Sequence, residues 1–318
     1  MTDKAMRISV PARGESLWCL ALLLVWVVVT VTFVGLRPEH LLLASAIFLL
    51  FFLTVPSRRL LVALLPFLIF GISYDWMNLL PNYKVNPIDV AGVYNAEKAA
   101  FGIPTSGGVL TPNEFFALHT NPAADFFAGL FYLCWVPLPV AYGFWMYFTR
   151  HTKGYLHFSI VFLLVNLIGF ALYYVHPAAP PWYVAEHGFI PVEGIPGSVG
   201  GLGAFDRMTG LGIFHGLYAR NSNVFAAIPS LHSAYTLIAF VYSLKYRSPM
   251  AWRWVLGIVT AGIWLTAVYT SHHYVIDVLC GIATALVGIA IFEFILMKIP
   301  SFSRFIDRYA AYVAIPKK

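Results

Sequence analysis

The sequence predicts an all-α polytopic membrane protein, a helical bundle of about eight transmembrane helices. Two observations lead to this prediction. Hydrophobic residues make up 60% of the 318 residues, charged residues only 11%, and the mean hydropathy is +0.76, whereas soluble domains are about half apolar and a quarter charged. The apolar residues also lie in long runs, and a helix needs about 20 of them to cross the hydrocarbon core of a bilayer.

Eight apolar segments are candidate spans. The first is longer than a signal-peptide core and no small-residue cleavage site follows it, so we expect it to stay as a span, with the mature chain beginning near Met1. Cys19, Cys134 and Cys280 lie inside apolar runs without metal-ligand spacing, so we expect them to be packing residues. The segments, of which the second is the shortest, are 17–36, 40–55, 60–80, 122–149, 155–175, 227–244, 252–270 and 273–297.

The distribution of Lys and Arg predicts the orientation. If the N-terminus is cytoplasmic and eight spans alternate, most of the 20 Lys and Arg residues fall on the cytoplasmic side, as the positive-inside rule requires. Both termini are then cytoplasmic, and the long loops 81–121 and 176–226 lie on the outer side. The net charge of +6 follows from this bias and needs no nucleic-acid partner.

The chain is expected to have three parts and no internal repeat. Residues 1–121 would hold the N-terminal spans and an outer interfacial loop, residues 122–298 the catalytic membrane core, and residues 299–318 a basic cytoplasmic tail. In the first outer loop, Thr111-Pro112-Asn113-Glu114 has the cap, the first-turn proline and the returning Glu of a capping box, which predicts a short helix in the membrane interface.

The second outer loop, 176–226, is rich in proline and glycine. This density is expected to exclude a regular helix. Because the loop leads directly into Pro229, we expect it to lie against the beginning of the sixth candidate span.

Two short segments carry ionisable groups at the heads of apolar runs, where such groups are costly unless they have a function. The segment Ala-Ile-Pro-Ser-Leu-His-Ser at 227–233 contains His232, and Ser-His-His-Tyr-Val-Ile-Asp at 271–277 contains His273 and Asp277. The residues His273 and Asp277 are four apart and would share one face of a helix, so that the carboxylate accepts the Nδ1 proton and leaves Nε2 free to attack. Pro229 would place His232 in the opening turn of its own helix.

Both helix N-termini would open outward and together form an electropositive setting for a phosphate. An imidazole nucleophile, an orienting carboxylate and a second imidazole that exchanges a proton suffice for phosphoryl transfer by double displacement. No metal ion or other cofactor is needed. Three other interpretations stay open at this stage: hydrogen-bonded packing residues, a proton relay in a non-enzymatic transporter, and a metal site of two His and one carboxylate.

These motifs resemble the type-2 phosphatidic-acid phosphatase superfamily. Pro-Ala-Ala-Pro-Pro-Trp at 177–182, Pro-Ser-Leu-His-Ser at 229–233 and the doubled histidine 272–273 are most similar to its inositol phosphorylceramide synthase branch, which is related to sphingomyelin synthases. The resemblance implies a six-helix phosphatase-like core with extra N-terminal spans. It also implies that His273 is the nucleophile, that Asp277 orients it, and that His232 protonates the leaving alkoxide and then deprotonates the acceptor hydroxyl.

The chain departs from the superfamily's pattern at three cationic positions. The first signature has a Lys six residues ahead of Arg-Pro. Here it would end at His176-Pro177, so that His176 replaces the Arg and Gly169 replaces the Lys. Ala267 stands where another Arg is expected. A phosphodiester carries one negative charge and needs fewer cations than a phosphomonoester. The departures therefore favour head-group transfer over a simple phosphatase. The candidate substrate-binding residues are His176, Arg220, Ser230 and His272.

The resemblance implies a phosphotransferase that moves a phosphoinositol-type head group from phosphatidylinositol to ceramide or dihydroceramide and releases diacylglycerol. A phosphatase of phosphatidate or polyprenyl pyrophosphate is the alternative within the superfamily, and a proton-coupled transporter is the alternative outside it. The active site would face the periplasm of a bacterial inner or plasma membrane, or the lumen of a Golgi-type membrane. Asp75, beside Tyr74 and Trp76, is expected either to contact a polyol head group or to belong to an interfacial aromatic anchor.

Overall fold

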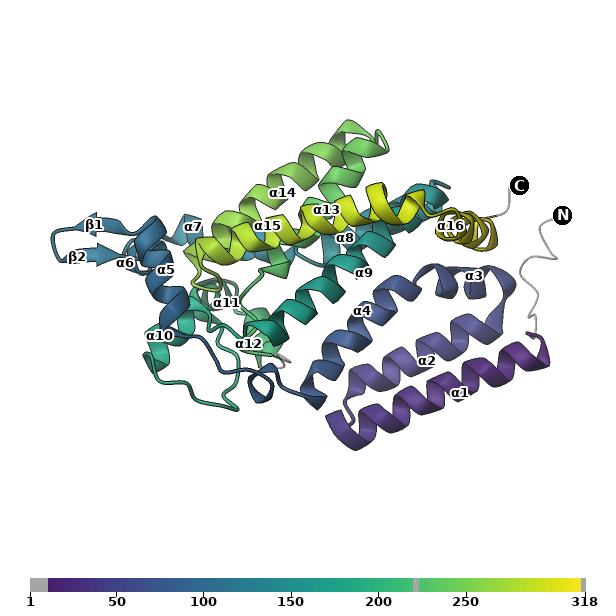
Figure 1. The fold of residues 1–318 in the computed structure, drawn as a ribbon, viewed down its shortest axis with the longest axis horizontal. Coiled ribbons are helices and arrows are strands. Elements are labelled where there is room, and N and C mark those ends of the chain that lie inside the picture. Colours follow the sequence, from purple (N-terminus) through teal and green to yellow (C-terminus); the bar gives the residue numbers. More distant parts are fainter. Residues whose placement is uncertain (1–10, 220–222, 316–318) are drawn as a thin grey trace.

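The computed structural model describes residues 11–219 and 223–315, and it is mostly helical (Figure 1). Each of the eight candidate segments contains helix. Four helices are long and apolar enough to cross a membrane, and two bent helix pairs raise the number to six if each pair is one span. The protein is therefore an α-helical membrane protein with four to six candidate spans in the described residues, and the predicted number of about eight is not reached.

The four long candidates each come from one predicted segment. The last of them begins as helix α15 and continues through a π-helical and a 3₁₀ segment. They are α1 with its π-helical end (Arg13–Val34), α9 (Thr152–Val175), α14 (Met250–Tyr269) and α15 with its extension (Val275–Lys298).

The two bent pairs have identifiable breaks. Helices α3 (Val55–Ala63) and α4 (Leu65–Trp76) meet at 54°, and α7 (Pro122–Leu133) and α8 (Pro137–Phe148) meet at 42°. A proline lies in the first turn of α4 and of α8. Proline cannot donate the helical hydrogen bond and clashes with the preceding turn, so it begins a new helix.

Two predicted spans are short. Helix α2 (Pro38–Leu53) has 16 residues and α13 (Leu231–Lys245) has 15, about 22–24 Å at 1.5 Å per residue, against a hydrocarbon core of about 30 Å. Helix α13 begins at Leu231 because Ser230 is its N-cap. Pro229 thus precedes the helix, whereas the sequence had suggested that it would lie in the first turn.

Helix α9 lies at the centre of the bundle and packs against α4, α8, α13, α15 and the C-terminal helix α16 (Pro300–Val313). The largest core cluster is correspondingly aromatic, and the ring of Phe162 contacts those of Phe158 and Tyr235. Residues 299–313, predicted only as a basic tail, mostly form α16, which is held to the bundle by the hydroxyl of Tyr147 donating to the carbonyl of Val313.

The outer loops gather at the end of the molecule opposite α16 (Figure 1). Thr111 caps helix α6 (Pro112–Leu118) through the predicted capping box. The first loop also contains elements that the sequence analysis missed: α5 (Ala91–Phe101) and a hairpin of strands β1 (Ile103–Thr105) and β2 (Gly108–Leu110).

The prediction that loop 176–226 excludes regular helix was wrong. It contains three short helices: α10 (Pro181–His187), α11 (Gly203–Thr209) and α12 (Ile213–Tyr218). Proline is compatible with the first turn of a helix, and glycine with the left-handed residue that ends one. Pro181 begins α10, and Gly188 and Gly210, with φ of 71° and 70°, follow α10 and α11. Proline and glycine here mark the boundaries of helices.

Candidate active site

The two histidine segments meet where α13 and α15 begin. Nδ1 of His232 lies 3.0 Å from Nε2 of His273, and the ring centroids are 5.2 Å apart. The predicted convergence of these two residues is therefore seen in the structure. Nε2 of His273, which we expected to be free, faces the other imidazole, so a reacting phosphorus would have to enter between the two rings.

His273 does not lie on a helix. It follows α14 in a turn in which Ser271 has a φ of 60°, and α15 begins only at Val275. The prediction that His273 and Asp277 share a helix face was therefore wrong, although the side chains do meet. Asp277 is the third residue of α15 and reaches back: its Oδ2 accepts a hydrogen bond from the Tyr274 N–H at 2.8 Å and lies 3.4 Å from Nδ1 of His273.

Asp277 also links the two segments through its backbone. Its carbonyl accepts a hydrogen bond from the Ser230 N–H at 2.9 Å, and Gly281, one turn further along α15, permits this approach. A Cβ at Gly281 would stand 2.1 Å from the Ser230 carbonyl oxygen. The missing side chain at position 281 therefore lets α15 lie directly against the residue that precedes Leu231 and His232.

The structure explains two of the missing cations. A Cβ at Gly169 would stand 2.7 Å from a methyl group of Leu231, so a lysine there would have to move the Leu231 side chain in the first turn of α13. Ala267 is fully buried, and its carbonyl accepts the backbone N–H groups of both His272 and His273. A lysine at position 169 or an arginine at position 267 would therefore need space that this packing does not leave.

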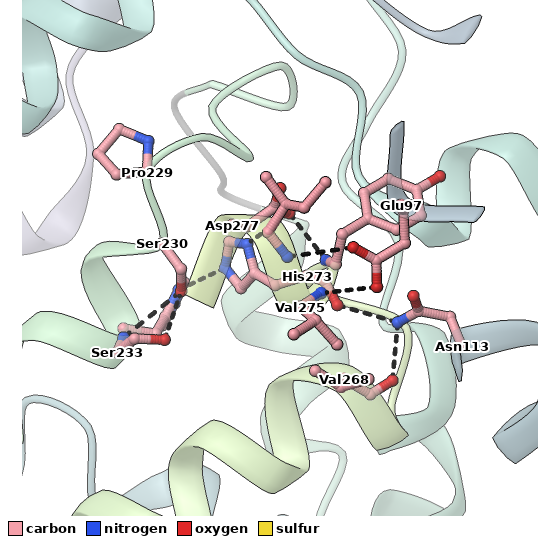
Figure 2. A network of polar contacts seen from close by, with 12 residues as sticks. Glu97, Asn113, Pro229, Ser230, Ser233, Val268, His273, Val275 and Asp277 are labelled. Atoms are coloured by element: carbon pink, nitrogen blue, oxygen red, sulfur yellow. Dashed lines mark hydrogen bonds and ion pairs between the residues drawn. The ribbon is translucent and has the colours of Figure 1, made fainter. Parts of the chain in front are cut away.

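Two residues of the first outer loop, which the sequence analysis missed, hold the segment that carries His273 (Figure 2). Glu97 of α5 is fully buried, and its two carboxylate oxygens accept hydrogen bonds from the N–H groups of Val275 at 2.9 Å and Ile276 at 3.1 Å. Asn113 of α6 is buried and donates from Nδ2 to the carbonyls of Val268 and His273, at 2.8 and 2.9 Å.

These contacts contradict the expected electropositive setting at α15. The N–H groups of Tyr274, Val275 and Ile276 are all bonded to carboxylates, of Asp277 or Glu97. The first turn of α15 is thus closed by negative groups and is not available to a phosphate. No pattern in 81–121 distinguishes Glu97 from a surface carboxylate, because its partners are 178 and 179 residues away.

Glu97 gives a prediction for pH dependence. Burial raises the pKa of its carboxyl group, and the N–H groups of Val275 and Ile276 offset only part of the rise. The folded protein then binds this proton more tightly than the unfolded chain, so the ionised group costs stability as the pH rises above about 4.5. We expect the melting temperature of the wild-type protein to fall more between pH 4.5 and 8 than that of Glu97→Gln, measured by scanning fluorimetry in detergent.

The matched control is Glu186→Gln, a change at an exposed carboxylate, which should leave the pH profile unchanged. Glutamine at position 97 keeps one acceptor oxygen, so its own cost, about 1–3 kcal/mol for one unsatisfied N–H, is independent of pH. Parallel profiles for the wild-type protein and Glu97→Gln would contradict the prediction.

The histidine pair opens into a cavity of about 610 Å³. His232, His272 and His273 line it together with many aromatic side chains, and the glycine-rich segment packs beside it, with the Gly201 N–H donating to the carbonyl of Thr270. The second outer loop therefore covers the site, as its position in the sequence predicted.

Polar groups of the N-terminal helices line the same cavity. Arg37 forms ion pairs with Asp75 and Glu39, and Nε2 of His40 lies 3.2 Å from Asp75. Among the described residues, Arg37 is the one Lys or Arg that lines the cavity. Asp75 is thus a cavity residue, which favours the polyol interpretation over a purely interfacial anchor.

The other predicted substrate-binding residues are placed differently. His272 lines the cavity, whereas Ser230 is fully buried as the N-cap of α13, with its Oγ accepting from the Ser233 N–H and hydroxyl. His176 is half exposed, and its Nε2 lies 3.3 Å from Asp89. Arg220 lies outside the described residues. Over residues 11–219 and 223–315, no group of three or more His, Cys, Asp or Glu side chains is placed to hold a metal ion.

A family model described as the PAP2 superfamily matches residues 109–291. The chain belongs to this superfamily. The matched region contains both histidine segments and excludes Arg37, Asp75 and Glu97.

Three relatives of this PAP2 protein have names that state an activity. The phosphoinositol dihydroceramide synthase of Bacteroides thetaiotaomicron is 52% identical over 307 residues, which cover 95% of this chain and 99% of the relative. The inositol phosphorylceramide synthase of Candida albicans is 32% identical over 43% of this chain and 28% of its own. The catalytic subunit AUR1 of the Saccharomyces cerevisiae enzyme is 31% identical over 37% of this chain and 29% of its own. No solved structure matches this PAP2 protein. The named relatives are enzymes, and this chain is an enzyme.

Proposed function

We propose that the protein transfers a phosphoinositol head group from phosphatidylinositol to ceramide or dihydroceramide and releases diacylglycerol. The main support is the contact between His232 and His273 at the wall of a largely aromatic cavity, with Asp277 beside the second ring. The Bacteroides relative, named for phosphoinositol and dihydroceramide, aligns along nearly its whole length and supports the choice of head group and acceptor.

His273 is suited to be the nucleophile. Burial lowers the pKa of its imidazole to about 4, an effect that the Ala227 carbonyl partly offsets, so the ring is neutral at physiological pH. With Nδ1–H directed at Asp277, the lone pair of Nε2 attacks phosphorus. The bond from phosphorus to the glycerol oxygen breaks, and His232, which is protonated when this step begins, gives that oxygen a proton. Diacylglycerol leaves, and the inositol phosphoryl group stays on Nε2 of His273.

The second displacement reverses the proton transfer. His232 takes the proton of the primary hydroxyl of the ceramide, the resulting alkoxide attacks phosphorus, and the bond from phosphorus to Nε2 breaks. His273 is regenerated and the sphingolipid leaves. An apolar cavity reached from the bilayer suits this reaction, because both substrates are lipids and water would hydrolyse the intermediate.

The proposed location follows from the same arrangement. The site lies at the end of the molecule where the outer loops gather, and the start of α1 and helix α16 lie at the other end (Figure 1). With the termini in the cytoplasm, the site faces the periplasm in a bacterial inner membrane or the lumen in a Golgi-type membrane.

The test uses the purified protein in nanodiscs, with phosphatidylinositol labelled in the inositol and dihydroceramide as acceptor. We expect the label to enter a sphingolipid with one equivalent of diacylglycerol released. Without acceptor, a quenched reaction should yield an inositol phosphate adduct on the peptide that contains His273. Release of head group to water at the same rate without dihydroceramide would favour a hydrolase. Proton-coupled lipid flux without any turnover would favour a transporter.

A further inference from the structure

The buried polar atoms of the cavity that have no hydrogen-bond partner among the described residues include the hydroxyl of Tyr132, on α7, and Nε2 of His272. Nε of Arg37 is another, but it is ion-paired with Glu39. Tyr132 is 1% exposed and His272 is 4% exposed. Buried polar groups in native proteins are nearly always bonded, and exceptions mark places where a ligand or water is bound. Both atoms therefore point to a group that enters the cavity.

The Tyr132 hydroxyl lies next to the reacting pair. The ring of Tyr132 stacks on His232, with centroids 5.1 Å apart and planes at 25°, and lies 5.4 Å from the ring of His272. The hydroxyl of Tyr218, on α12, lies near that of Tyr132 but outside hydrogen-bond geometry, and the Tyr218 ring is 4.6 Å from that of His272. Both tyrosines line the same cavity as His232 and His273, between which a phosphorus would be held.

The cavity has no unpaired cation for the phosphate among the described residues. Arg37 is already paired with Asp75 and Glu39. Two cationic positions of the superfamily are occupied by Gly169 and Ala267, and the first turn of α15 is closed by carboxylates. A phosphodiester anion must therefore find neutral hydrogen-bond donors here.

His272 cannot be such a donor while it is neutral. The Thr270 hydroxyl donates its hydrogen to the carbonyl of Thr266, so its oxygen accepts the hydrogen of Nδ1 of His272 at 3.0 Å. Burial, with His273 and His232 nearby, lowers the pKa of His272 well below its usual value. Nε2 of His272 then carries a lone pair, which suits a substrate hydroxyl and repels a phosphate oxygen.

The tyrosines keep their protons. Burial raises the pKa of the Tyr218 hydroxyl well above its usual value, and the neighbouring Tyr132 raises it further. A tyrosine hydroxyl that stays protonated is a donor of fixed position, and donors fixed before the reaction stabilise charge that develops on phosphate oxygens.

We propose that the hydroxyl groups of Tyr132 and Tyr218 form a neutral binding site for the non-bridging oxygens of a lipid phosphodiester. The site takes the place of the Lys and Arg that other members of the superfamily are expected to use. Two neutral donors suit the single charge of a phosphodiester and leave the second charge of a phosphomonoester unpaired. The inference rests on the proposed function, because the site would hold the phosphate group of the donor lipid, phosphatidylinositol.

The test compares Tyr132→Phe and Tyr218→Phe with the control Tyr142→Phe. Tyr142 is fully buried on α8, and its hydroxyl is bonded to that of Ser248, away from the cavity. We expect kcat/KM for phosphatidylinositol to fall about 10²-fold to 10³-fold in Tyr132→Phe, as for loss of one donor to a developing anion, and to fall by a similar factor in Tyr218→Phe. The control should stay within about threefold of the wild-type protein.

The melting temperature distinguishes a binding role of the Tyr132 hydroxyl from a structural one. Because the Tyr132 hydroxyl is unpaired in the unliganded protein, Tyr132→Phe should leave the melting temperature unchanged or raise it, whereas Tyr142→Phe removes a bond and should lower it. Unchanged kinetics in Tyr132→Phe, or a rate that falls together with its melting temperature, would overturn the proposal.

Binding separates this inference from the proposed function. In a His273→Gln background, which cannot turn over, adding Tyr132→Phe should weaken phosphatidylinositol binding about tenfold or more, measured by native mass spectrometry. Equal binding with and without Tyr132→Phe would reject the site even if transfer is found. Failure of the wild-type protein to label a sphingolipid would reject the function while this comparison still reports on the site.

Discussion

Replacing His273 with glutamine should lower the rate of head-group transfer about 10⁴-fold or more, because no other group can form the covalent intermediate. Replacing His232 with glutamine should lower it about 10²-fold to 10⁴-fold, the usual contribution of a general acid and base. Nδ1 of His232 lies 3.0 Å from Nε2 of His273. Each variant therefore removes one side of the gap that a phosphorus would enter. The measurement is the initial rate with phosphatidylinositol and dihydroceramide.

An activated donor distinguishes the two roles. In a p-nitrophenyl phosphodiester of inositol, the leaving group departs without a proton, so His232→Gln should regain a burst of nitrophenol of about one equivalent. Onward transfer to dihydroceramide should stay slow in this variant, because the base for the second step is missing. His273→Gln should show no burst. An equal response of both variants to the activated donor would contradict the assigned roles.

The sequence predicted that His232, His273 and Asp277 meet, because the information was local. His232, His273 and Asp277 stand at the heads of apolar runs, where ionisable groups have to be explained, and each lies within a short motif. The convergence of the two histidines followed from reading both helices as beginning on the same side of the membrane. The reason given for the pairing of His273 with Asp277 was wrong, because the helix begins two residues after the histidine.

The supports of the site could not be predicted in the same way. Glu97 and Asn113 reach the His273 segment from 155 or more residues away in sequence. Each looks like an ordinary loop residue until the fold brings α5 and α6 over the first turn of α15. Tyr132 likewise reads as one aromatic residue in an apolar run, and only the absence of a partner for its hydroxyl makes it notable.

The predicted number of about eight spans is not confirmed, for a similar reason. Apolar content predicted where helices form, and all eight segments do contain helix. The length and straightness of the helices depend on single residues. Ser230 caps α13, so this helix begins only at Leu231, and the prolines at the start of α4 and α8 divide two of the predicted segments. Hydropathy averaged over a window of about 19 residues does not register such breaks.

Asp277→Asn should lower the transfer rate about 10³-fold to 10⁴-fold, as expected when the group that fixes the tautomer of a catalytic imidazole is lost. Oδ2 of Asp277 accepts the Tyr274 N–H at 2.8 Å and also lies 3.4 Å from Nδ1 of His273. With its amide oxygen at this place, asparagine keeps both contacts and loses only the charge. With its amide nitrogen there, the cap of α15 is lost and amide hydrogens face Nδ1 of His273. The ring would turn its lone pair to Nδ1 and carry its proton on Nε2, where the nucleophilic lone pair is needed.

Asp206→Asn is the matched control, since Asp206 is a buried carboxylate that accepts hydrogen bonds from the N–H groups of Phe214 and His215 and from Nδ1 of His215 at 2.7 Å. It should lower the melting temperature but change the rate less than about tenfold, because Asp206 contacts none of His232, His273 and Asp277. The tautomer in Asp277→Asn can be read directly from the ¹⁵N chemical shifts of labelled His273. If the shifts match those of the wild-type protein while the rate still falls, Asp277 acts through the charge of its carboxylate and the tautomer argument fails.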